Sequence, residues 1–135
     1  MNNDEISILN QEGYDLMAAA FEVYNELGNG FTEDIYQEAL ETELATRGIP
    51  YASQVPVLIY YKARPLKKTF KPDLITHDQI VVELKAHKTL LPEHEAQLIN
   101  YLKAMRKPIG YLINFGSPGK LQWQRIIRTP ETNQK

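Results

Sequence analysis

Two acids and one lysine in the segment FKPDLITHDQIVVELKA, residues 70–86, have types and a spacing that could support chemistry. Asp73 falls on one expected strand and Glu83 on the next, and a turn predicted at residues 77–78 would fold the two strands into a hairpin. Glu83 and Lys85 are two residues apart, so their side chains share one face of a strand. The pattern therefore predicts two carboxylates and one ammonium group lying close together.

Two carboxylates at one point repel each other unless a proton or a cation lies between them. A hard divalent cation that prefers oxygen ligands, such as Mg²⁺ or Mn²⁺, meets that requirement. Lys85 could then orient or help deprotonate a metal-bound water, or stabilise a developing negative charge. Hydrolysis of a phosphodiester requires this combination of groups.

The same residues also have a purely structural interpretation. A Glu-x-Lys pair on a strand is commonly a solvated face, and an aspartate that follows proline near a strand end often serves only a turn. The position of Glu83 and Lys85 favours chemistry, because their charged face interrupts an apolar run in the expected middle of a sheet. Unpaired charge is costly there.

The periodicity of the chain predicts the helices and strands that position these residues. Thr32 offers an N-cap oxygen to the second of two N-terminal helices, and Gly48 would close that helix. Pro72 must take a bulge or an unpaired edge position in its strand. The expected elements are helices over 14–27 and 33–47, strands over 54–61, 67–75 and 80–86, a helix over 92–105, and strands over 109–115 and 121–127.

This order of elements predicts an α/β fold in which helices pack on one mixed β-sheet. At 135 residues the chain has the length of one domain. We therefore expect a single domain over residues 1–128 and a polar C-terminal tail over residues 129–135.

Composition excludes several kinds of site. The chain has no cysteine, so a metal must bind to carboxylate, imidazole or carbonyl groups. The acidic, polar N-terminus lacks the features of a signal peptide, and no stretch is long enough to span a membrane, so we expect a cytoplasmic protein with no membrane partner. The net charge of −2 gives no general attraction to nucleic acid, which would have to bind through a local patch or metal ions.

The motifs and their order resemble a known nuclease signature. Pro72 and Asp73, followed by Val82 and then by ELK at residues 83–85, resemble the signature of the PD-(D/E)XK nuclease superfamily. The core order of that superfamily is helix, three strands, helix, strand, as predicted above. The resemblance implies a restriction-endonuclease-like core, a mixed central β-sheet flanked by helices in α-β-β-β-α-β order, with an extra N-terminal helix and a C-terminal strand.

A second resemblance is narrower. The segment GFTEDIY, residues 30–36, is similar to the Gly-x-x-Glu-x-x-Tyr motif of the small bacterial family called GxxExxY proteins, which belongs to that superfamily. The segments ELKA, HEAQLINYL and LINFG are also similar to typical segments of the family. Together these similarities extend from about Tyr14 to Ile127.

The resemblance implies roles for individual residues. Asp73 and Glu83 would be metal ligands, with the backbone carbonyl of Leu84 as a further oxygen, and Lys85 would act on the attacking water. Glu33 matches an acid that many members of the superfamily place above the metal site. An acid in a first helical turn also favours the helix dipole, so both interpretations of Glu33 remain open.

Three further residues have two interpretations each. Gln97 and Tyr101 are four residues apart and share a helix face. They resemble the Gln-x-x-x-Tyr element at the active site of recombination-type exonucleases of the superfamily, although Gln97 could be merely exposed and Tyr101 half-buried. Tyr36, one turn beyond Glu33, could be either an accessory site residue or a core aromatic.

The expected partner is nucleic acid, either DNA or RNA, cleaved with Mg²⁺ or Mn²⁺ by the two carboxylates and the lysine, with Glu33 and Gln97 assisting. Basic residues over 62–71 and 85–88 could meet phosphates near the acids, although such clusters usually only blunt a sheet edge. One alternative is a nuclease-like module with little or no turnover that binds nucleic acid or protein. Another is an interaction protein that forms homo-oligomers through an exposed sheet edge or its last strand.

Overall fold

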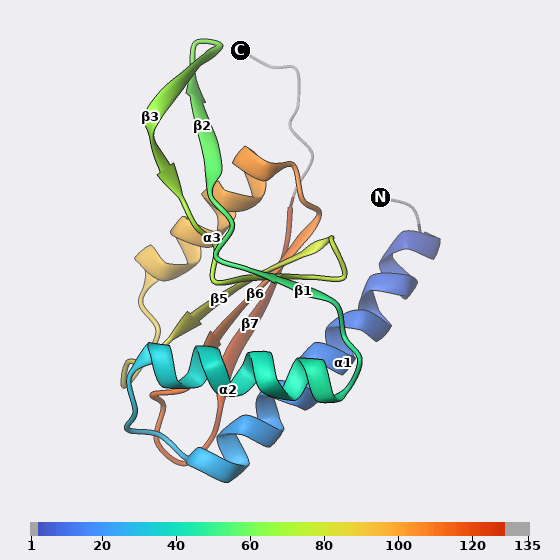
Figure 1. Cartoon of the computed structure of the whole chain (residues 1–135), viewed down its shortest axis with the longest axis vertical. Coiled ribbons are helices and arrows are strands. Elements are labelled where there is room, and N and C mark those ends of the chain that lie inside the picture. The colour runs from blue at the N-terminus through green and yellow to red at the C-terminus, as the bar shows by residue number, and fades with distance from the viewer. Residues whose placement is uncertain (1–2, 129–135) are drawn as a thin grey trace.

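A five-stranded sheet in the order β1-β4-β5-β6-β7 forms the centre of the molecule (Figure 1). The computed structural model describes the backbone of residues 3–128 and the side chains of residues 9–128. Strands β5 and β6 are parallel and the other neighbouring pairs are antiparallel, so the sheet is mixed, as predicted. Its strands are β1 (Tyr51–Ser53), β4 (Leu74–Thr76), β5 (Ile80–Lys85), β6 (Ile109–Asn114) and β7 (Gln122–Ile127).

Helices cover both faces of this sheet. The larger core lies between one face and the helices α1 (Asn3–Leu27) and α2 (Glu33–Thr46). On the other face, Leu98 and Leu102 of α3 (Pro92–Met105) pack against Val81 of β5. Because side chains alternate along a strand, Glu83 and Lys85 point to the same side of the sheet as Val81. The charged residues of β5 therefore lie on the α3 side.

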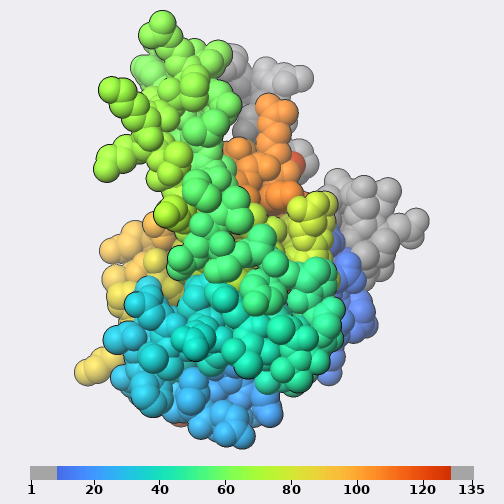
Figure 2. All heavy atoms as spheres, in the orientation of Figure 1, coloured from blue at the N-terminus to red at the C-terminus, as the bar shows by residue number. Residues whose placement is uncertain are grey.

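The two remaining strands form a separate ribbon that projects from the body (Figures 1 and 2). Strands β2 (Val57–Tyr61) and β3 (Arg64–Phe70) pair only with each other, and a turn at Lys62 and Ala63 joins them. The turn is shorter than the stretch over 62–66 that separates the two predicted strands. We call residues 57–71 the β2–β3 ribbon.

The ribbon corrects two predicted strands. The expected strand over 67–75 is divided, because the chain leaves the ribbon at Phe70, passes Pro72 and joins the main sheet as β4. Proline has no N–H to donate to a strand ladder, so the strand breaks at Pro72 instead of forming a bulge. The expected strand over 54–61 starts at Val57, and the short strand β1 before it was not predicted.

The helices differ less from the prediction. Helix α1 starts at Asn3 and not at Tyr14, and Leu9, which precedes the predicted start, is buried in the larger core. Thr32 is the N-cap of α2, but its side chain makes no capping hydrogen bond. The predicted tail over 129–135 lies outside the described residues. No helix within residues 3–128 is long and apolar enough to cross a membrane.

Candidate active site

The two acids meet where β4 begins beside β5. Leu74 pairs with Val82, so Asp73 and Glu83 are the next residues of the antiparallel pair. The backbone N–H of Asp73 donates to Oε1 of Glu83 at 3.0 Å, and the backbone N–H of Leu84 donates to Oδ2 of Asp73 at 2.7 Å. Each carboxylate is thus oriented by one backbone hydrogen bond, and its second oxygen is left for another partner.

Burial makes negative charge costly at this point. Glu83 is only 6% exposed, and burial followed by the charge of Asp73 raises the pKa of Glu83 to about 8. Burial also raises the pKa of Asp73, with a further contribution from Glu33, against the lowering effect of the hydrogen bond from Leu84. Two adjacent acids that both resist ionisation favour a proton or a cation between them.

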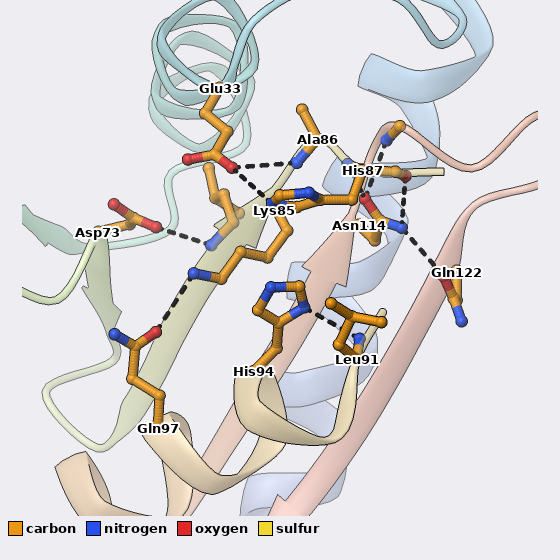
Figure 3. A network of polar contacts seen from close by, with 12 residues as sticks. Glu33, Asp73, Lys85, Ala86, His87, Leu91, His94, Gln97, Asn114 and Gln122 are labelled. Atoms are coloured by element: carbon orange, nitrogen blue, oxygen red, sulfur yellow. Dashed lines mark hydrogen bonds and ion pairs between the residues drawn. The ribbon is translucent and has the colours of Figure 1, made fainter. Parts of the chain in front are cut away.

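Helix α3 holds the lysine of the site. Nζ of Lys85 donates to Oε1 of Gln97 at 3.2 Å. Gln97 precedes Leu98, which packs into the core, so the anchored helix carries the amide to this position. Figure 3 shows the Lys85 side chain directed toward Gln97, with Asp73 on the neighbouring strand. The structure therefore brings Gln97 to Lys85. The charge of Lys85 offsets part of the rise in the pKa of both acids.

Glu33 approaches the end of β5 from α2 (Figure 3). Its Oε2 accepts a hydrogen bond from the backbone N–H of Ala86 at 3.2 Å and lies 3.7 Å from Nε2 of His87. The Glu33 side chain is 47% exposed, so part of its carboxylate remains open to solvent. The first residue of α2 is thus placed beside the residue that follows Lys85.

Tyr36 lies in the core, below the loop that leads to Glu33. Its ring stacks on Phe115, with centroids 4.6 Å apart and an interplanar angle of 9°. Its hydroxyl donates to the carbonyl of Gly28 and accepts from the backbone N–H of Phe31 at 3.3 Å. Tyr36 therefore takes the position of a core aromatic that fixes the loop before α2.

Tyr101 links α3 to the root of the β2–β3 ribbon. Its ring stacks on Phe70 with centroids 4.2 Å apart. Burial first, and then the charges of Glu83 and Asp73, raise the pKa of the half-buried Tyr101. The structure thus places Tyr101 near the acids, where it also supports the ribbon.

The residues that hold the chain after Lys85 were not predicted from the sequence. Asn114, fully buried at the end of β6, accepts from the backbone N–H of His87 and donates to its carbonyl, each at 2.9 Å. A Cβ on Gly116 would lie 2.4 Å from the backbone nitrogen of His87, so glycine is needed at this close approach. Gln122 accepts from Asn114 and from the backbone N–H of Leu90 (Figure 3). An asparagine ending an apolar strand was the available signal.

Gln37 is a second residue that was not predicted. Its Nε2 donates to the backbone carbonyl of Asp73 at 2.8 Å, and the backbone N–H of Gln54 donates to the same carbonyl at 3.2 Å. Gln37 lies one helical turn beyond Glu33, so both project toward the strand ends that carry the acids. The spacing of Glu33 and Gln37 was visible in the sequence, but the contact with Asp73 depends on the tertiary fold.

The groups present fit a hard divalent cation. Asp73 and Glu83 supply carboxylate oxygens. The carbonyl of Lys85 accepts from Phe115 on the β6 side, so the preceding carbonyl, that of Leu84, points to the opposite side, toward Asp73. Among the described residues, no group of three or more Asp, Glu or His side chains could hold a metal ion. A cation at this point would thus depend on two carboxylates, a backbone carbonyl and water.

Comparison with known proteins identifies the class to which this site belongs. The chain matches the family model of the PD-(D/E)XK nuclease superfamily over residues 10–126. Because the match covers most of the chain, the protein belongs to the PD-(D/E)XK nuclease superfamily. No significant match is found among proteins with curated descriptions.

A solved structure supports the fold. The chain is similar to the structure titled "Crystal structure of SSO0001", with a TM-score of 0.60 and 24% sequence identity. The similarity covers 73% of this chain and 52% of the other, so the chain spans about half the length of that protein. At this identity the similarity shows the fold alone. Together with the family match, it confirms the predicted restriction-endonuclease-like core.

Proposed function

We propose that this protein is a nuclease that uses Mg²⁺ or Mn²⁺ to hydrolyse phosphodiester bonds of nucleic acid at a site formed by Asp73, Glu83 and Lys85. The convergence of a buried and a half-buried acid, each with a raised pKa, beside a lysine in the central strand carries the proposal. Superfamily membership supports it, since PD-(D/E)XK nucleases generally use divalent metals.

Each residue of the site has a task in this proposal. Asp73 and Glu83 would hold the cation together with the carbonyl of Leu84. The cation would lower the pKa of water and offset negative charge on the phosphoryl oxygens. Lys85, restrained by its hydrogen bond to Gln97, would orient the attacking water or the phosphate. Glu33 would orient the chain that follows Lys85 through its hydrogen bond to Ala86 and assist at the metal site.

We also propose that residues 1–128 form one nuclease domain of the GxxExxY group. The three residues of that motif act together in the structure. Gly30 has φ of +119°, a conformation that side chains rarely adopt, at the bend before α2. Tyr36 binds the same loop through its hydroxyl, and Glu33 extends from that loop to Ala86. In this proposal, Gly30 and Tyr36 fix the loop that positions the carboxylate of Glu33.

Calorimetric titration with Mn²⁺ tests the proposal. Asp73→Asn and Glu83→Gln should weaken Mn²⁺ binding by about 10-fold or more, because each removes a charged ligand. The matched control is Asp78→Asn, which removes a carboxylate from the turn between β4 and β5, where the side chain is 92% exposed. Asparagine tolerates the positive φ of 58° at that position.

Cleavage of labelled single-stranded and duplex DNA and RNA is followed in the same samples. We expect cleavage to be lost in Asp73→Asn and Glu83→Gln and retained in Asp78→Asn. If the natural protein binds no Mn²⁺, and both variants are at least as stable, the metal-dependent nuclease proposal is wrong. A nuclease-like binding module would then be the better description.

A further inference from the structure

The β2–β3 ribbon contributes nothing to the two hydrophobic cores. Neither core cluster contains a residue between Val57 and Lys71. Every residue of β3 except Phe70 is exposed, and Tyr60 and Tyr61 of β2 are 60% and 62% exposed. An isolated two-stranded hairpin is at best marginally stable in water. A ribbon of this kind is therefore better suited to an external contact than to stabilising the fold.

The ribbon carries charge of one sign only. Residues 57–71 include five lysines or arginines and no acid, whereas the other 120 residues include ten basic and seventeen acidic residues. The basic side chains thus have no acidic neighbour within the ribbon, and their mutual repulsion favours an anionic partner. They are Lys62, Arg64, Lys67, Lys68 and Lys71.

The tip of the ribbon places a positive charge where the backbone favours other residues. Lys62 and Ala63 have φ of 50° and 64°, and such two-residue turns prefer asparagine and glycine. The Nζ of Lys62 lies 5.5 Å from the centre of the Tyr61 ring. The tip therefore presents a cation and an aromatic face together, which suits contact with both phosphates and bases.

One face of the ribbon leads to the acids. Arg64 and Phe70 share a face, because their partners Tyr61 and Val57 are four residues apart on β2. Phe70 stacks on Tyr101, which is one helical turn from Gln97, and Asp73 follows Phe70 by three residues. At about 3.3 Å per residue, Arg64 lies at most about 30 Å along the chain from Asp73, close to one turn of duplex.

The acidic body directs a polyanion toward the ribbon. The groove between α1 and α2 is lined by four glutamates, and no lysine or arginine lines it. A phosphate backbone would be repelled from that groove and attracted to the ribbon. The glutamates are Glu22, Glu26, Glu38 and Glu43.

We propose that the β2–β3 ribbon is a substrate arm, which binds the sugar-phosphate backbone of a nucleic acid and directs it to Asp73 and Glu83. This inference rests on the proposed nuclease function for its substrate class. A second copy of this chain is a poorer occupant, because a symmetric contact between two ribbons would bring ten basic groups together.

The test is binding to fluorescent DNA and RNA in EDTA, measured by anisotropy at several KCl concentrations. Probes of about 20 base pairs, roughly two helical turns, are compared with single strands of equal length. The ribbon variant is Arg64→Gln, Lys67→Gln and Lys68→Gln combined. The matched control combines Lys103→Gln, Arg106→Gln and Lys120→Gln, which remove three exposed charges from other surfaces.

We expect the ribbon variant to bind about 10- to 100-fold more weakly. The slope of log K against log [KCl] should become less steep by up to about 2.7 for duplex or about 2.1 for single strands, the values for three lost phosphate contacts. The form of nucleic acid with the larger loss identifies the preferred substrate. The control should bind like the natural protein. A variant with Arg64→Lys and Lys68→Arg, which keeps both charges, should also retain binding. That result would assign the weaker binding of the ribbon variant to its lost charges and not to the changed side chains.

Equal affinity and equal salt dependence in the ribbon variant and the natural protein would overturn the proposal. So would a natural protein that is dimeric when the ribbon variant is monomeric by light scattering, because the ribbon would then be a self-association surface. Hydrolysis of bis(4-nitrophenyl) phosphate, which is too small to reach the ribbon, reports the catalytic site separately. If only the ribbon proposal is wrong, the natural protein still hydrolyses this compound. If the nuclease proposal is wrong, the natural protein does not hydrolyse it.

Discussion

Glu83 combines deep burial with a neighbouring acid, so its protonation couples to folding. In the metal-free folded protein its pKa is about 8, compared with 4.5 when it is free of the fold. The unfolded chain therefore releases this proton first as the pH rises. The free energy of unfolding should fall by up to about 1.4 kcal/mol per pH unit between these two values. The stabilisation is complete below about pH 4.5 and lost as the pH passes about 8.

Urea unfolding at a series of pH values in EDTA measures this effect. The raised pKa of Asp73 acts in the same direction, so the natural protein should lose stability steadily as the pH rises. Glu83→Gln cannot ionise and should flatten the profile. Asp78→Asn should leave the profile unchanged. Identical profiles for the natural protein and Glu83→Gln would show that the acid is not held in its neutral form.

The adjacency of the two acids follows from local rules, whereas their supports do not. The period of a strand and the turn at residues 77–78 are enough to bring Asp73 and Glu83 together. Gln37 and Asn114 were not predicted, because each contact joins residues 27 or more positions apart in the chain. Such contacts depend on how the helices and strands pack, and residue type alone does not specify that.

At the scale of elements, the loop before α2 determines where Glu33 lies. Tyr36→Phe keeps the stacking on Phe115 and removes the hydroxyl that binds Gly28 and Phe31. Loss of these hydrogen bonds should reduce the free energy of unfolding by about 1 to 3 kcal/mol. Cleavage should fall more than Mn²⁺ binding does, because Tyr36 positions Glu33 and not the two metal-binding acids.

Thermal unfolding, calorimetry and cleavage assays on Tyr36→Phe test this expectation. Tyr14→Phe is the matched control, since the Tyr14 side chain is 72% exposed and the substitution removes the same atom. If Tyr36→Phe were as stable as Tyr14→Phe, the hydroxyl would not hold the loop. If both variants lost cleavage equally, the position of Glu33 would not explain the loss.

The elements were predictable where their periodicity is long and uninterrupted. Helices α2 and α3 and strands β5, β6 and β7 lie close to the ranges predicted from the sequence. The two strands of the ribbon were predicted, but their separation from the main sheet was not, because alternation over 54–75 marks extended chain but does not specify which strand each segment joins. Pro72 was the local signal, since a residue without an N–H interrupts a ladder and permits a change of sheet.

At the scale of the whole molecule, the ribbon is an insertion between two strands that are already neighbours. Ser53 of β1 pairs with Leu74 of β4, and the N–H of Gln54 donates to the carbonyl of Asp73 at 3.2 Å. The chain therefore leaves the main sheet and returns to it at almost the same point. The acidic body and the basic ribbon are consequently separable in sequence as well as in charge.

This geometry predicts the result of removing the ribbon. Replacement of residues 55–72 by Asn-Gly would join β1 to β4 through a two-residue turn between Gln54 and Asp73, which favours a hairpin. The shortened protein should fold, because neither core cluster includes a removed residue. It should bind Mn²⁺ and hydrolyse bis(4-nitrophenyl) phosphate nearly as the natural protein does, yet bind nucleic acid much more weakly.

Circular dichroism, calorimetry, the hydrolysis assay and anisotropy on the shortened protein measure these four properties. Loss of Phe70 uncovers Tyr101, so a stability decrease of about 0.5 to 1.5 kcal/mol is expected from the lost stacking alone. A shortened protein that folds, binds Mn²⁺ and still holds DNA or RNA as tightly as the natural chain would place substrate binding on the body. In that case the nucleic acid would have to approach the acids past Glu33 and Asp34, where the surface is negatively charged, as the nucleic acid is.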